Sequence, residues 1–343
     1  MFDVICEIGV NHENSLEKAL NMIKDIGSID TKGLVKISAK FQFYKAEKLA
    51  SKISPAYWDI TQEKTTSQRE LFKKFDKFSI NDYKLLSKEC DNQNIEFMAT
   101  AFDEESLQAI DPLVSRHKIA SADLTNIPLV REVAKLQKPI ILSTGASNEE
   151  EIRNTCKEIR ILNPYPITLL HCVLLYPTPD NKANLIYIDE LRDKFPNTKV
   201  GYSDHTVPDK NLSIIKLAFS KDIVTLEKHY TFNKKLKGND HYHSIDISDL
   251  QNLIKFLDWY KLALGNKGLD DRSNEEKAIK HARRSIVSKV PLKKGSILTS
   301  DVITTKRPAH GIPSIEWDNI IGKTLNQDLK ADTSLSWSMI LDH

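Results

Sequence analysis

The sequence predicts an α/β fold in which eight parallel strands form a barrel, followed by a small second domain. Short apolar runs rich in β-branched residues alternate with longer amphipathic runs as far as Leu264, and this alternation is typical of a parallel sheet covered by helices. Eight such units are present, the number that closes a (β/α)8 or TIM barrel. An open doubly wound sheet is the alternative, because the number of strands does not prove closure.

The individual elements follow from the periodicity of apolar residues. Strands are expected at residues 2–10, 34–43, 95–102, 117–123, 139–146, 167–173, 199–205 and 223–231. Helices are expected at residues 11–26, 80–91, 104–110, 126–136, 148–161, 185–194, 211–220 and 248–264. The segment 44–79 is too long for an ordinary crossover between two strands. We expect it to form a lid or a wall of a pocket, or alternatively a surface loop.

Composition excludes several classes of protein. The chain has 343 residues, of which 40% are hydrophobic, enough for one large core and a smaller one. Its net charge of +2, from 49 basic and 47 acidic residues, is too small for a nucleic-acid binder. The N-terminal MFDVICEIGV lacks a basic region, and no stretch is apolar for long enough to span a bilayer, so we expect a soluble, cytoplasmic protein. The four cysteines lack CxxC spacing and are expected to be reduced thiols.

The sequence changes character after the last expected helix. We expect the barrel at residues 1–265, a polar linker at 266–282 and the second domain at 283–343. Strand-like runs at 285–290 and 297–303 flank a turn at 293–295. A domain this small has a core of marginal stability, so we expect it to pack on the barrel or on another subunit.

Polar residues gather where the expected strands end. Parallel barrels carry their chemistry at the carboxyl ends of the strands, so these residues form the candidate site. They are Glu7, Asn11, His12, Lys40, Gln42, Thr100, Lys118, Ser121, Asp123, Ser143, Thr144, His171, Tyr176, His205 and His229.

Two of these residues, Lys40 and Lys118, are lysines inside apolar strands. Burial of an unpaired ammonium group is costly. A buried salt bridge, or a register that turns the lysine toward the helices, explains one such residue. Two on separate strands favour an anionic substrate.

His205 and His229 each close an expected strand. Two neutral imidazoles at the ends of consecutive strands can hold a divalent metal and leave coordination positions open for a substrate. A single strand histidine is more often a core residue, but the pair favours a metal site. Asp204, next to His205, is expected to orient an imidazole.

Three further residues receive less weight. His241 and His243 can add metal ligands, although a solvated loop is the expected explanation for both. Cys172 lacks an electropositive context in the sequence and is expected to be an inert buried thiol.

Eight short runs, in order from end to end of the chain, resemble the sialic acid synthase family. Each run alone is a weak signal, whereas eight in order on the expected strands are specific. The C-terminal segment is similar to that family's small antifreeze-like, or SAF, domain. The runs are EIGVNH (7–12), KFQ (40–42), KIASAD (118–123), ILSTGA (141–146), HCVLLYPTP (171–179), GYSDHT (201–206), EKHYT (227–231) and KRPAHG (306–311).

This resemblance implies an enzyme that condenses phosphoenolpyruvate with an N-acylated hexosamine, releases phosphate and forms a nine-carbon 2-keto-3-deoxy acid. It implies that His205 and His229 are catalytic and bind a divalent ion, expected to be Mn²⁺ with Mg²⁺ or Co²⁺ as alternatives, which holds the sugar aldehyde. It also implies that Glu7 and Asp123 are catalytic and handle protons or place water. Substrate binding is implied for Lys40, Gln42, Lys118, Ser121, Ser143, Tyr176, Ser203, Asp240 and Arg307.

Two of these implied roles concern the sugar. Asp240 would bind it directly. Arg307 would hold its N-acyl group from the other subunit of a homodimer, with the SAF domain packed on the partner barrel.

The resemblance leaves the activity open between three candidates. N-acetylneuraminate synthase, acting on N-acetylmannosamine, is the default. A legionaminic or pseudaminic acid synthase using a di-N-acylated sugar is the close alternative, and a catalytically silent sugar-binding relative is the second. The run Val173-Leu174-Leu175, where the family often has Asn or Ser, slightly favours the silent relative, whereas the retained histidines, lysines and Glu7 oppose it.

Overall fold

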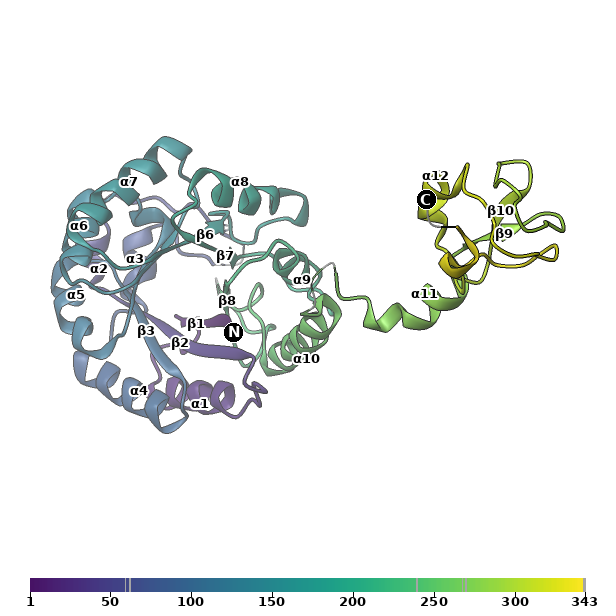
Figure 1. Cartoon of the computed structure of the whole chain (residues 1–343). Coiled ribbons are helices and arrows are strands. Elements are labelled where there is room, and N and C mark those ends of the chain that lie inside the picture. Colours follow the sequence, from purple (N-terminus) through teal and green to yellow (C-terminus); the bar gives the residue numbers. More distant parts are fainter. Residues whose placement is uncertain (59, 62, 239, 267, 269, 342–343) are drawn as a thin grey trace. The chain divides into compact units, whose positions relative to one another are not determined.

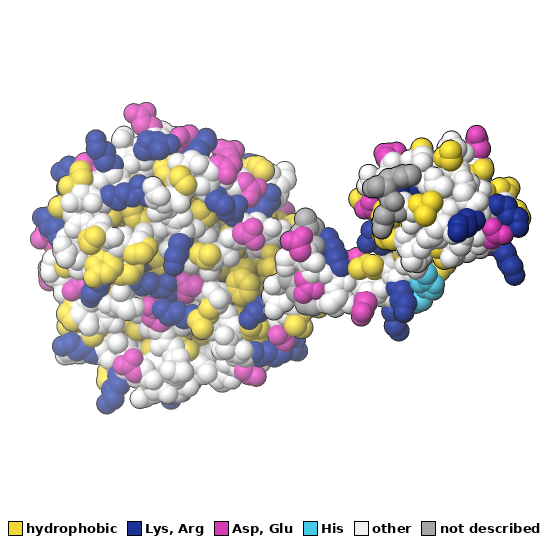
Figure 2. Space-filling model, viewed as in Figure 1, with side chains coloured by type: hydrophobic (Ala, Val, Ile, Leu, Met, Phe, Trp, Pro, Cys, Tyr) yellow, Lys and Arg dark blue, Asp and Glu magenta, His cyan; other side chains and the backbone are white. Residues whose placement is uncertain are grey.

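The computed structural model of the chain describes residues 1–58, 60–61, 63–238, 240–266, 268 and 270–341. Contacts divide the chain into two compact units, Met1–Leu264 and Gly265–His343. On the visible surface of both units, Lys and Arg side chains are interspersed with Asp and Glu (Figure 2). No helix among the described residues combines the length and the apolar character needed to cross a bilayer.

The first unit is a closed barrel of eight parallel strands, seen as a ring in Figure 1. Hydrogen-bonded neighbours follow the order β3-β2-β1-β8-β7-β6-β5-β4, and β3 and β4, at the two ends of this order, lie against each other. The predicted (β/α)8 barrel is confirmed, and the open sheet is wrong. The strands are β1 (Phe2–Gly9), β2 (Val35–Phe43), β3 (Glu96–Ala101), β4 (His117–Ile119), β5 (Ile140–Ser143), β6 (Ile167–Cys172), β7 (Lys199–Asp204) and β8 (Thr225–His229).

Helices connect the strands and cover the outside of the ring (Figure 1). Their apolar faces pack on the outward-facing strand residues; in the first helix Met22, Ile23 and Ile26 are buried in this way. The helices are α1 (Leu16–Gly27), α2 (Ala46–Leu49), α3 (Gln68–Lys73), α4 (Ile80–Asn92), α5 (Glu104–Ile110), α6 (Ile127–Lys135), α7 (Glu149–Leu162), α8 (Ile186–Lys194), α9 (Ser213–Phe219) and α10 (Ile247–Leu264). Single 3-10 turns are η1 (Asp111–Leu113), η2 (Ser121–Asp123) and η3 (Asp180–Lys182).

One strand boundary differs from the prediction in a way that affects the site. Residues 117–123 were expected to be one strand, but β4 ends at Ile119 and η2 follows. The amide of Asp123 donates to the carbonyl of Ala120 over 3.0 Å, and the amide of Leu124 donates to that of Ser121 over 3.2 Å. These local bonds turn the chain, which brings Ser121 and Asp123 to the end of the barrel.

Inward-pointing side chains form three layers because successive residues of a strand face opposite sides. Along β1 the layers are represented by Asp3, Ile5 and Glu7. The amino-end layer comprises Asp3, Ser38, Glu96, Arg116 and Thr225, which are linked by hydrogen bonds. The middle layer is an apolar cluster of Ile5, Met98, Ile141 and Leu170. The carboxyl-end layer comprises Glu7, Lys40, Lys118, Ser143, Ser203, Glu227 and His229.

Gly201 on β7 leaves room for the middle layer. A Cβ atom at this position would lie 2.5 Å from Leu170 Cδ2 and 2.4 Å from the carbonyl oxygen of Thr225. Both distances are too short for real contacts, so a larger residue would displace the apolar layer that separates the two polar ones.

Residues 44–79 contain α2 and α3 and a β-bridge between Pro55 and Ser67. Trp58 is buried, and its indole nitrogen donates to the carbonyl oxygen of Glu63 over 3.2 Å. Residues 59 and 62 of the segment lie outside the described residues. Side chains on it, Tyr57, Trp58, Gln68, Leu71, Phe72 and Phe75, line a cavity at the carboxyl ends of the strands, so the pocket-wall interpretation is confirmed.

The second unit has its own small core, which includes Ile286, Leu298 and Leu335. Its strands β9 (Ser285–Ser288) and β10 (Ile303–Lys306) pair in antiparallel fashion. The strand expected at residues 297–303 is wrong over most of its length, because the amides of Val302 and Ile303 both donate to the carbonyl of Thr299 and form a turn. The remaining elements are η4 (Ser273–Glu275), α11 (Glu276–Ala282), η5 (Ser314–Glu316), α12 (Trp317–Ile320) and η6 (Trp337–Met339).

The linker expected at residues 266–282 falls in this second unit. It carries η4 and α11, while residues 267 and 269 lie outside the described residues. All four cysteines of the chain are free and buried, and all of them lie in the first unit.

Candidate active site

A cavity of about 410 Å³ opens at the carboxyl ends of the barrel strands. Every residue of the first unit to which the resemblance assigns a role lines it, whereas Asn11, His12, Thr144 and His171, which were also predicted from the strand ends, are not among its lining residues. The residues with an assigned role are Glu7, Lys40, Gln42, Lys118, Ser121, Asp123, Ser143, Tyr176, Ser203, His205, His229 and Asp240. Arg307 is exposed and belongs to the second unit.

The strand register places the central residues side by side. Glu7 is paired with Lys40 of β2 on one side and with His229 of β8 on the other. On β7 and β8, Ser203 is paired with Glu227. Since neighbouring positions in a parallel sheet share a face, these residues all point into the cavity.

Both buried lysines have carboxylate partners. Lys40 forms an ion pair with Glu7, and Lys118 Nζ lies 3.5 Å from Glu227 Oε2. Gln42 Nε2 donates to Glu7 Oε1 over 3.0 Å, and Ser203 Oγ donates to Glu227 Oε1 over 3.2 Å. A buried salt bridge therefore accounts for each lysine, yet both ammonium groups also face the cavity, where an anion can reach them.

Burial and charge act against each other in this cluster. Burial lowers the pKa of Lys118 below its ordinary value, even though Glu227 counteracts the effect. Burial alone would also lower the pKa of Lys40, but the carboxylates of Glu227 and Glu7 raise it. Burial would raise the pKa of Glu227, but Lys118 and Lys40 hold it below its ordinary value. Lys40 and Glu227 are therefore charged at neutral pH.

Two polar atoms of the cavity wall have unused hydrogen-bonding capacity. Ser143 Oγ and Glu227 Oε2 are buried and have no hydrogen-bond partner among the residues that the structure describes. Such groups are rare in folded proteins and require a bound water, ion or ligand. Glu227 lies beside Lys118, and Ser143 lines the same cavity, so these groups suit the cavity to a polar anionic ligand.

The two histidines of the predicted metal site lie together. The ring centres of His205 and His229 are 5.5 Å apart, and Tyr176 lies beside His205 with its ring centre at 4.2 Å. His205 Nδ1 is 3.0 Å from the carbonyl oxygen of Val173. A carbonyl only accepts, so Nδ1 carries a proton and Nε2 is the nitrogen left to bind a metal, which is how protein partners commonly orient metal-binding histidines.

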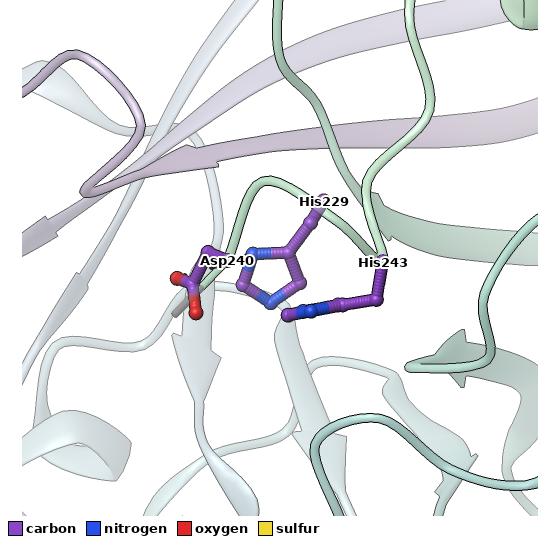
Figure 3. Close-up of side chains that lie close together, drawn as sticks. All are labelled: His229, Asp240 and His243. Carbon is purple, nitrogen blue, oxygen red and sulfur yellow. Dashed lines mark ion pairs between the residues drawn. The ribbon is translucent and has the colours of Figure 1, made fainter. Parts of the chain in front are cut away.

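A set of possible metal ligands extends this pair. One ligand atom from each of His229, Asp240 and His243 lies within 4.8 Å of the others, while His205 is outside this set. Figure 3 shows the His229 imidazole between the Asp240 carboxylate and the His243 ring, and His229 Nδ1 is 3.4 Å from Asp240 Oδ2. Burial lowers the pKa of His229 and of His243 well below the ordinary value, which keeps both imidazoles neutral. The donor set therefore fits a divalent transition-metal ion.

The solvated loop expected around His241 and His243 is wrong. His241 is 3% exposed and His243 is fully buried. The loop returns to the end of β8, where the amide of Ile245 donates to the carbonyl of His229 over 2.8 Å. Sequence alone does not reveal this return, because it depends on contacts between loop and strand.

Asp204 does not orient a histidine. It lies on the outer face of β7, opposite in direction to Ser203 and His205, and pairs there with Lys228 at 2.7 Å. Tyr202 donates a hydrogen bond to the same carboxylate over 2.9 Å. Lys228 Nζ also donates to the carbonyl of Thr206 over 2.6 Å, so these two partners explain how Lys228 is buried without facing the cavity.

Two other expectations need correction. His171 faces the helices, stacks on Tyr202 and lies 2.8 Å from the carbonyl oxygen of Ala183. Cys172 does have electropositive neighbours: its sulfur is 3.8 Å from His205 Nδ1. Burial alone would raise the pKa of this thiol, but His205, Ser121 and Lys118 lower it.

Glu227 is the main site residue that the sequence analysis missed. In the sequence it is part of the EKHYT run, and strand alternation alone is enough to direct it into the cavity. Residues two apart share a face, so Glu227 must point the same way as His229, and Lys228 must point the opposite way.

One wall of the cavity is apolar. Leu49, Tyr57, Trp58, Leu71, Phe72, Phe75, Phe102 and Leu174 contribute to it. Leu174 comes from the run that departs from the resembled family, so the apolar replacement adds to this wall. The cavity thus joins a charged side to an apolar side.

Comparisons with known proteins identify relatives over the whole chain. The model of the NeuB family matches residues 36–268, and the model of the SAF domain matches residues 283–341. The chain is 34% identical to the N,N'-diacetyllegionaminic acid synthase of Campylobacter jejuni, over 96% of this chain and 97% of that protein. It is 32% identical to the N,N'-diacetyllegionaminic acid synthase of Legionella pneumophila, over 98% and 94%.

A solved structure shows the same relationship. The N-acetylneuraminic acid (sialic acid) synthetase of Leptospira borgpetersenii, solved in complex with citrate, has a TM-score of 0.70 and 31% sequence identity. The match covers 81% of this chain and 90% of that one.

Proposed function

The chain belongs to the NeuB family, and from this we propose that its barrel cavity condenses phosphoenolpyruvate with a di-N-acylated hexosamine to form a nonulosonic acid. The observation that carries the proposal is the convergence of two buried lysines, two histidines and unpaired polar atoms on one cavity with an apolar wall. Relatives named as diacetyllegionaminic acid synthases support the choice of acceptor.

The proposed reaction forms one carbon–carbon bond and releases phosphate. C3 of phosphoenolpyruvate attacks the aldehyde carbon of the open-chain sugar, and the aldehyde oxygen takes up a proton. Water adds to C2 and loses a proton. The bond between C2 and the phosphate oxygen then breaks, which leaves the 2-keto acid and free phosphate.

The charged side of the cavity suits phosphoenolpyruvate. Lys40 and Lys118 can form charge-assisted hydrogen bonds to its phosphate and carboxylate, and such bonds are the strongest available to an anion. Ser143 Oγ, which has no partner among the described residues, can donate to the same groups. Gln42, Ser121 and Ser203 line the cavity around them.

His205 and His229 are proposed to hold a divalent ion beside the acceptor aldehyde. When bound, such an ion draws electrons from the aldehyde oxygen and makes the aldehyde carbon a better target for C3. Val173 fixes the ring of His205 through Nδ1, and Tyr176 packs against that ring. These contacts hold the imidazole in place before any ligand arrives.

Glu7 and Asp123 are proposed to handle protons. Burial raises the pKa of both carboxyl groups above their ordinary values. A carboxyl group with a raised pKa can give and take a proton near neutral pH. Glu7 lies between Lys40 and His229 in the register, next to the proposed aldehyde site.

The acceptor is proposed to use the apolar wall. A second N-acyl group adds a methyl that can pack on Phe72, Phe75 or Trp58, whereas N-acetylmannosamine carries one acyl group. Asp240 is proposed to bind a sugar hydroxyl from the opposite side. N-acetylmannosamine is the second candidate acceptor, supported by the similarity to the Leptospira N-acetylneuraminic acid synthetase.

Arg307 is proposed to hold an N-acyl group from the other subunit of a homodimer. Its side chain is exposed on the small second unit, so it is available for such a contact. Arg307→Ala should raise KM for the sugar and leave KM for phosphoenolpyruvate unchanged. An equal increase of both would contradict this role.

Phosphate release from phosphoenolpyruvate tests the proposal. The protein should be assayed with N-acetylmannosamine, with the diacetamido sugars that lead to legionaminic and pseudaminic acid, and without sugar. We expect release only with sugar and the highest kcat/KM with a diacetamido sugar. A higher kcat/KM with N-acetylmannosamine would reverse the choice of acceptor, and no release with any sugar would favour a catalytically silent relative.

A further inference from the structure

His243 occupies an unusual position for a loop residue. It is fully buried, and its ring centre lies 4.8 Å from that of His229, 6.0 Å from that of His205 and 5.6 Å from that of Tyr176. The three imidazoles thus form one cluster at the end of β8. A histidine in a solvent-exposed loop would not be held against two other imidazoles in this way.

The loop is held firmly enough to fix this position. Asn11 Nδ2 donates to Ser244 Oγ over 3.0 Å and to the carbonyl of Tyr230 over 2.9 Å. The amides of Ile245 and Thr231 form further bonds that tie the loop to the end of β8. The His243 ring is therefore presented to His229 by a defined backbone and not by chance.

Both ring nitrogens of His243 lack a hydrogen-bond partner among the described residues, and so does Nδ1 of His229. A buried imidazole normally has at least one partner, because an unpaired polar group loses its hydration without compensation. His241, two residues away in the same loop, follows the rule: its Nδ1 lies 2.8 Å from Thr231 Oγ1 and its Nε2 lies 3.5 Å from Glu13 Oε1. His243 is the exception that needs a ligand.

We propose that His243 is a direct ligand of the divalent ion, joining His205 and His229 in a site of three imidazoles, and that this added imidazole shifts the site's preference toward nitrogen-binding ions such as Zn²⁺, Co²⁺ or Fe²⁺. The inference rests on the proposed function for the presence of an ion in the cavity. Neutral imidazoles suit these metals, whereas Mn²⁺ and Mg²⁺ favour carboxylate, carbonyl and water oxygens. A third imidazole therefore changes which ion is held, as well as how tightly.

Metal titration of the full chain tests this inference. The protein is stripped with a chelator, and the affinities for Zn²⁺ and Mn²⁺ are measured by competition in the wild type and in His243→Ala, His243→Gln and His241→Gln. Loss of an outer partner of a metal ligand costs roughly 10- to 100-fold in affinity, so loss of His243 should cost at least as much for Zn²⁺. The ratio of Zn²⁺ to Mn²⁺ affinity should also fall at least about tenfold in both His243 variants, because one of the ligands that discriminates between the two ions is gone.

The controls separate coordination from folding. His241→Gln changes a buried histidine of the same loop and should keep wild-type metal affinity. The visible absorption of Co²⁺-loaded protein should change in both His243 variants and stay unchanged in His241→Gln. If His243→Ala unfolds without metal, His243→Gln, which fills more of the space, gives the answer. Wild-type Zn²⁺ affinity and an unchanged Zn²⁺ to Mn²⁺ ratio in a folded His243 variant would overturn the proposal.

The outcome does not depend on whether the proposed reaction takes place. A wild type that forms product while folded His243 variants keep wild-type metal affinity would overturn this inference and leave the proposed function standing. Metal affinity that depends on His243 in a protein that forms no product would support the inference and count against the proposed function.

Discussion

The amino-end and carboxyl-end layers of the barrel interior contain similar side chains but differ in how completely those side chains are paired. In the amino-end layer, Arg116 donates to both Asp3 and Glu96, with Nη1 2.5 Å from Asp3 Oδ2 and Nη2 2.6 Å from Glu96 Oε2. Ser38 donates to Glu96 over 2.7 Å, and Thr225 donates to Asp3 over 3.1 Å. Each charged group in this layer thus has hydrogen-bond partners within the layer, which is built from five separate segments of the chain.

The carboxyl-end layer is incomplete by comparison. Lys118 approaches Glu227 only to 3.5 Å. Ser143 Oγ, Glu227 Oε2 and His229 Nδ1 have no hydrogen-bond partner within the described part of the chain. The same barrel therefore holds one polar layer that is complete in the protein itself and one that a ligand can complete.

This difference separates stability from function. Residues at the amino face of such barrels serve stability, and residues at the carboxyl face serve catalysis. A site kept ready for ligands retains unpaired polar groups, which cost stability while the site is empty. Substitutions in the two layers should accordingly affect different properties.

The largest effect is expected from His205→Ala. Loss of a proposed metal ligand that polarises the aldehyde should lower kcat by about 10³-fold, since such polarisation contributes several kcal/mol. The unfolding midpoint should stay close to the wild-type value. His117→Gln is the matched control, because this buried histidine contacts Asp111 and does not line the cavity; it should keep activity. An equal loss of activity in His205→Ala and His117→Gln would contradict the specific role of His205 in catalysis.

Arg116→Met should produce the opposite pattern. It leaves Asp3 and Glu96 without their main partner in a buried place, and breaking such a pair costs about 3–5 kcal/mol of unfolding free energy. Urea unfolding measures this loss. At temperatures where the variant is folded, kcat and KM should match the wild type, and a specific drop in kcat would contradict the assignment of this layer to stability.

Acid should weaken the amino-end layer in a defined pH range. Burial alone would raise the pKa of Glu96, but Arg116 and hydrogen bonds from Ser115 and Ser38 lower it from 4.5 to about 2. As the pH falls, Glu96 is therefore protonated in the unfolded state before it is protonated in the folded state. The stabilisation by its charged form is present above pH 4.5 and is lost as the pH falls toward 2. A shift of this size corresponds to roughly 3 kcal/mol.

Glu96→Gln isolates this contribution. Urea unfolding between pH 5 and pH 3 should show a steep loss of stability in the wild type and a flatter dependence in the variant. Identical slopes would mean that other carboxylates cause the acid sensitivity.

The smallest expected effect comes from a pair of serines. Ser143→Ala removes a buried hydroxyl without a described partner, so the unfolding free energy should stay equal or rise by up to about 1 kcal/mol while KM for phosphoenolpyruvate increases. Ser38→Ala removes a hydroxyl with two described partners and should lower the unfolding free energy by about 1–2 kcal/mol without changing KM. A higher unfolding free energy in Ser38→Ala, or a lower one in Ser143→Ala, would contradict the proposed difference in pairing between the two layers.

The sequence predicted local features well and long-range ones poorly. Apolar runs placed all eight strands, and polar residues at their ends placed Glu7, Lys40 and His229 in one cavity, because both depend on spacing along the chain. The network of Asp3 and Arg116 joins residues 113 positions apart and leaves no local signal. The burial of His243 also escaped prediction, since it depends on how a loop folds back on β8.

Some errors came from signals that were present. Alternation along β8 was sufficient to direct Glu227 inward and Lys228 outward, and the same rule excludes Asp204 from the site. The turn at residues 299–303 was harder to predict from the sequence, because the apolar residues there follow the pattern of a strand. Only the hydrogen bonds to the Thr299 carbonyl show that the chain turns at this point.

The most direct test of the account is the unfolding midpoint with and without phosphoenolpyruvate, measured with Mn²⁺ present. If the carboxyl-end layer is completed by this anion, the midpoint of the wild type should rise, with a gain of about 2.7 kcal/mol at a ligand concentration of 100 times Kd. Arg116→Met should show the same gain from a lower starting point, whereas Lys118→Met should show little or none. No rise in the wild type at millimolar phosphoenolpyruvate, or an equal rise in Lys118→Met, would contradict the central claim that this layer is built to bind it.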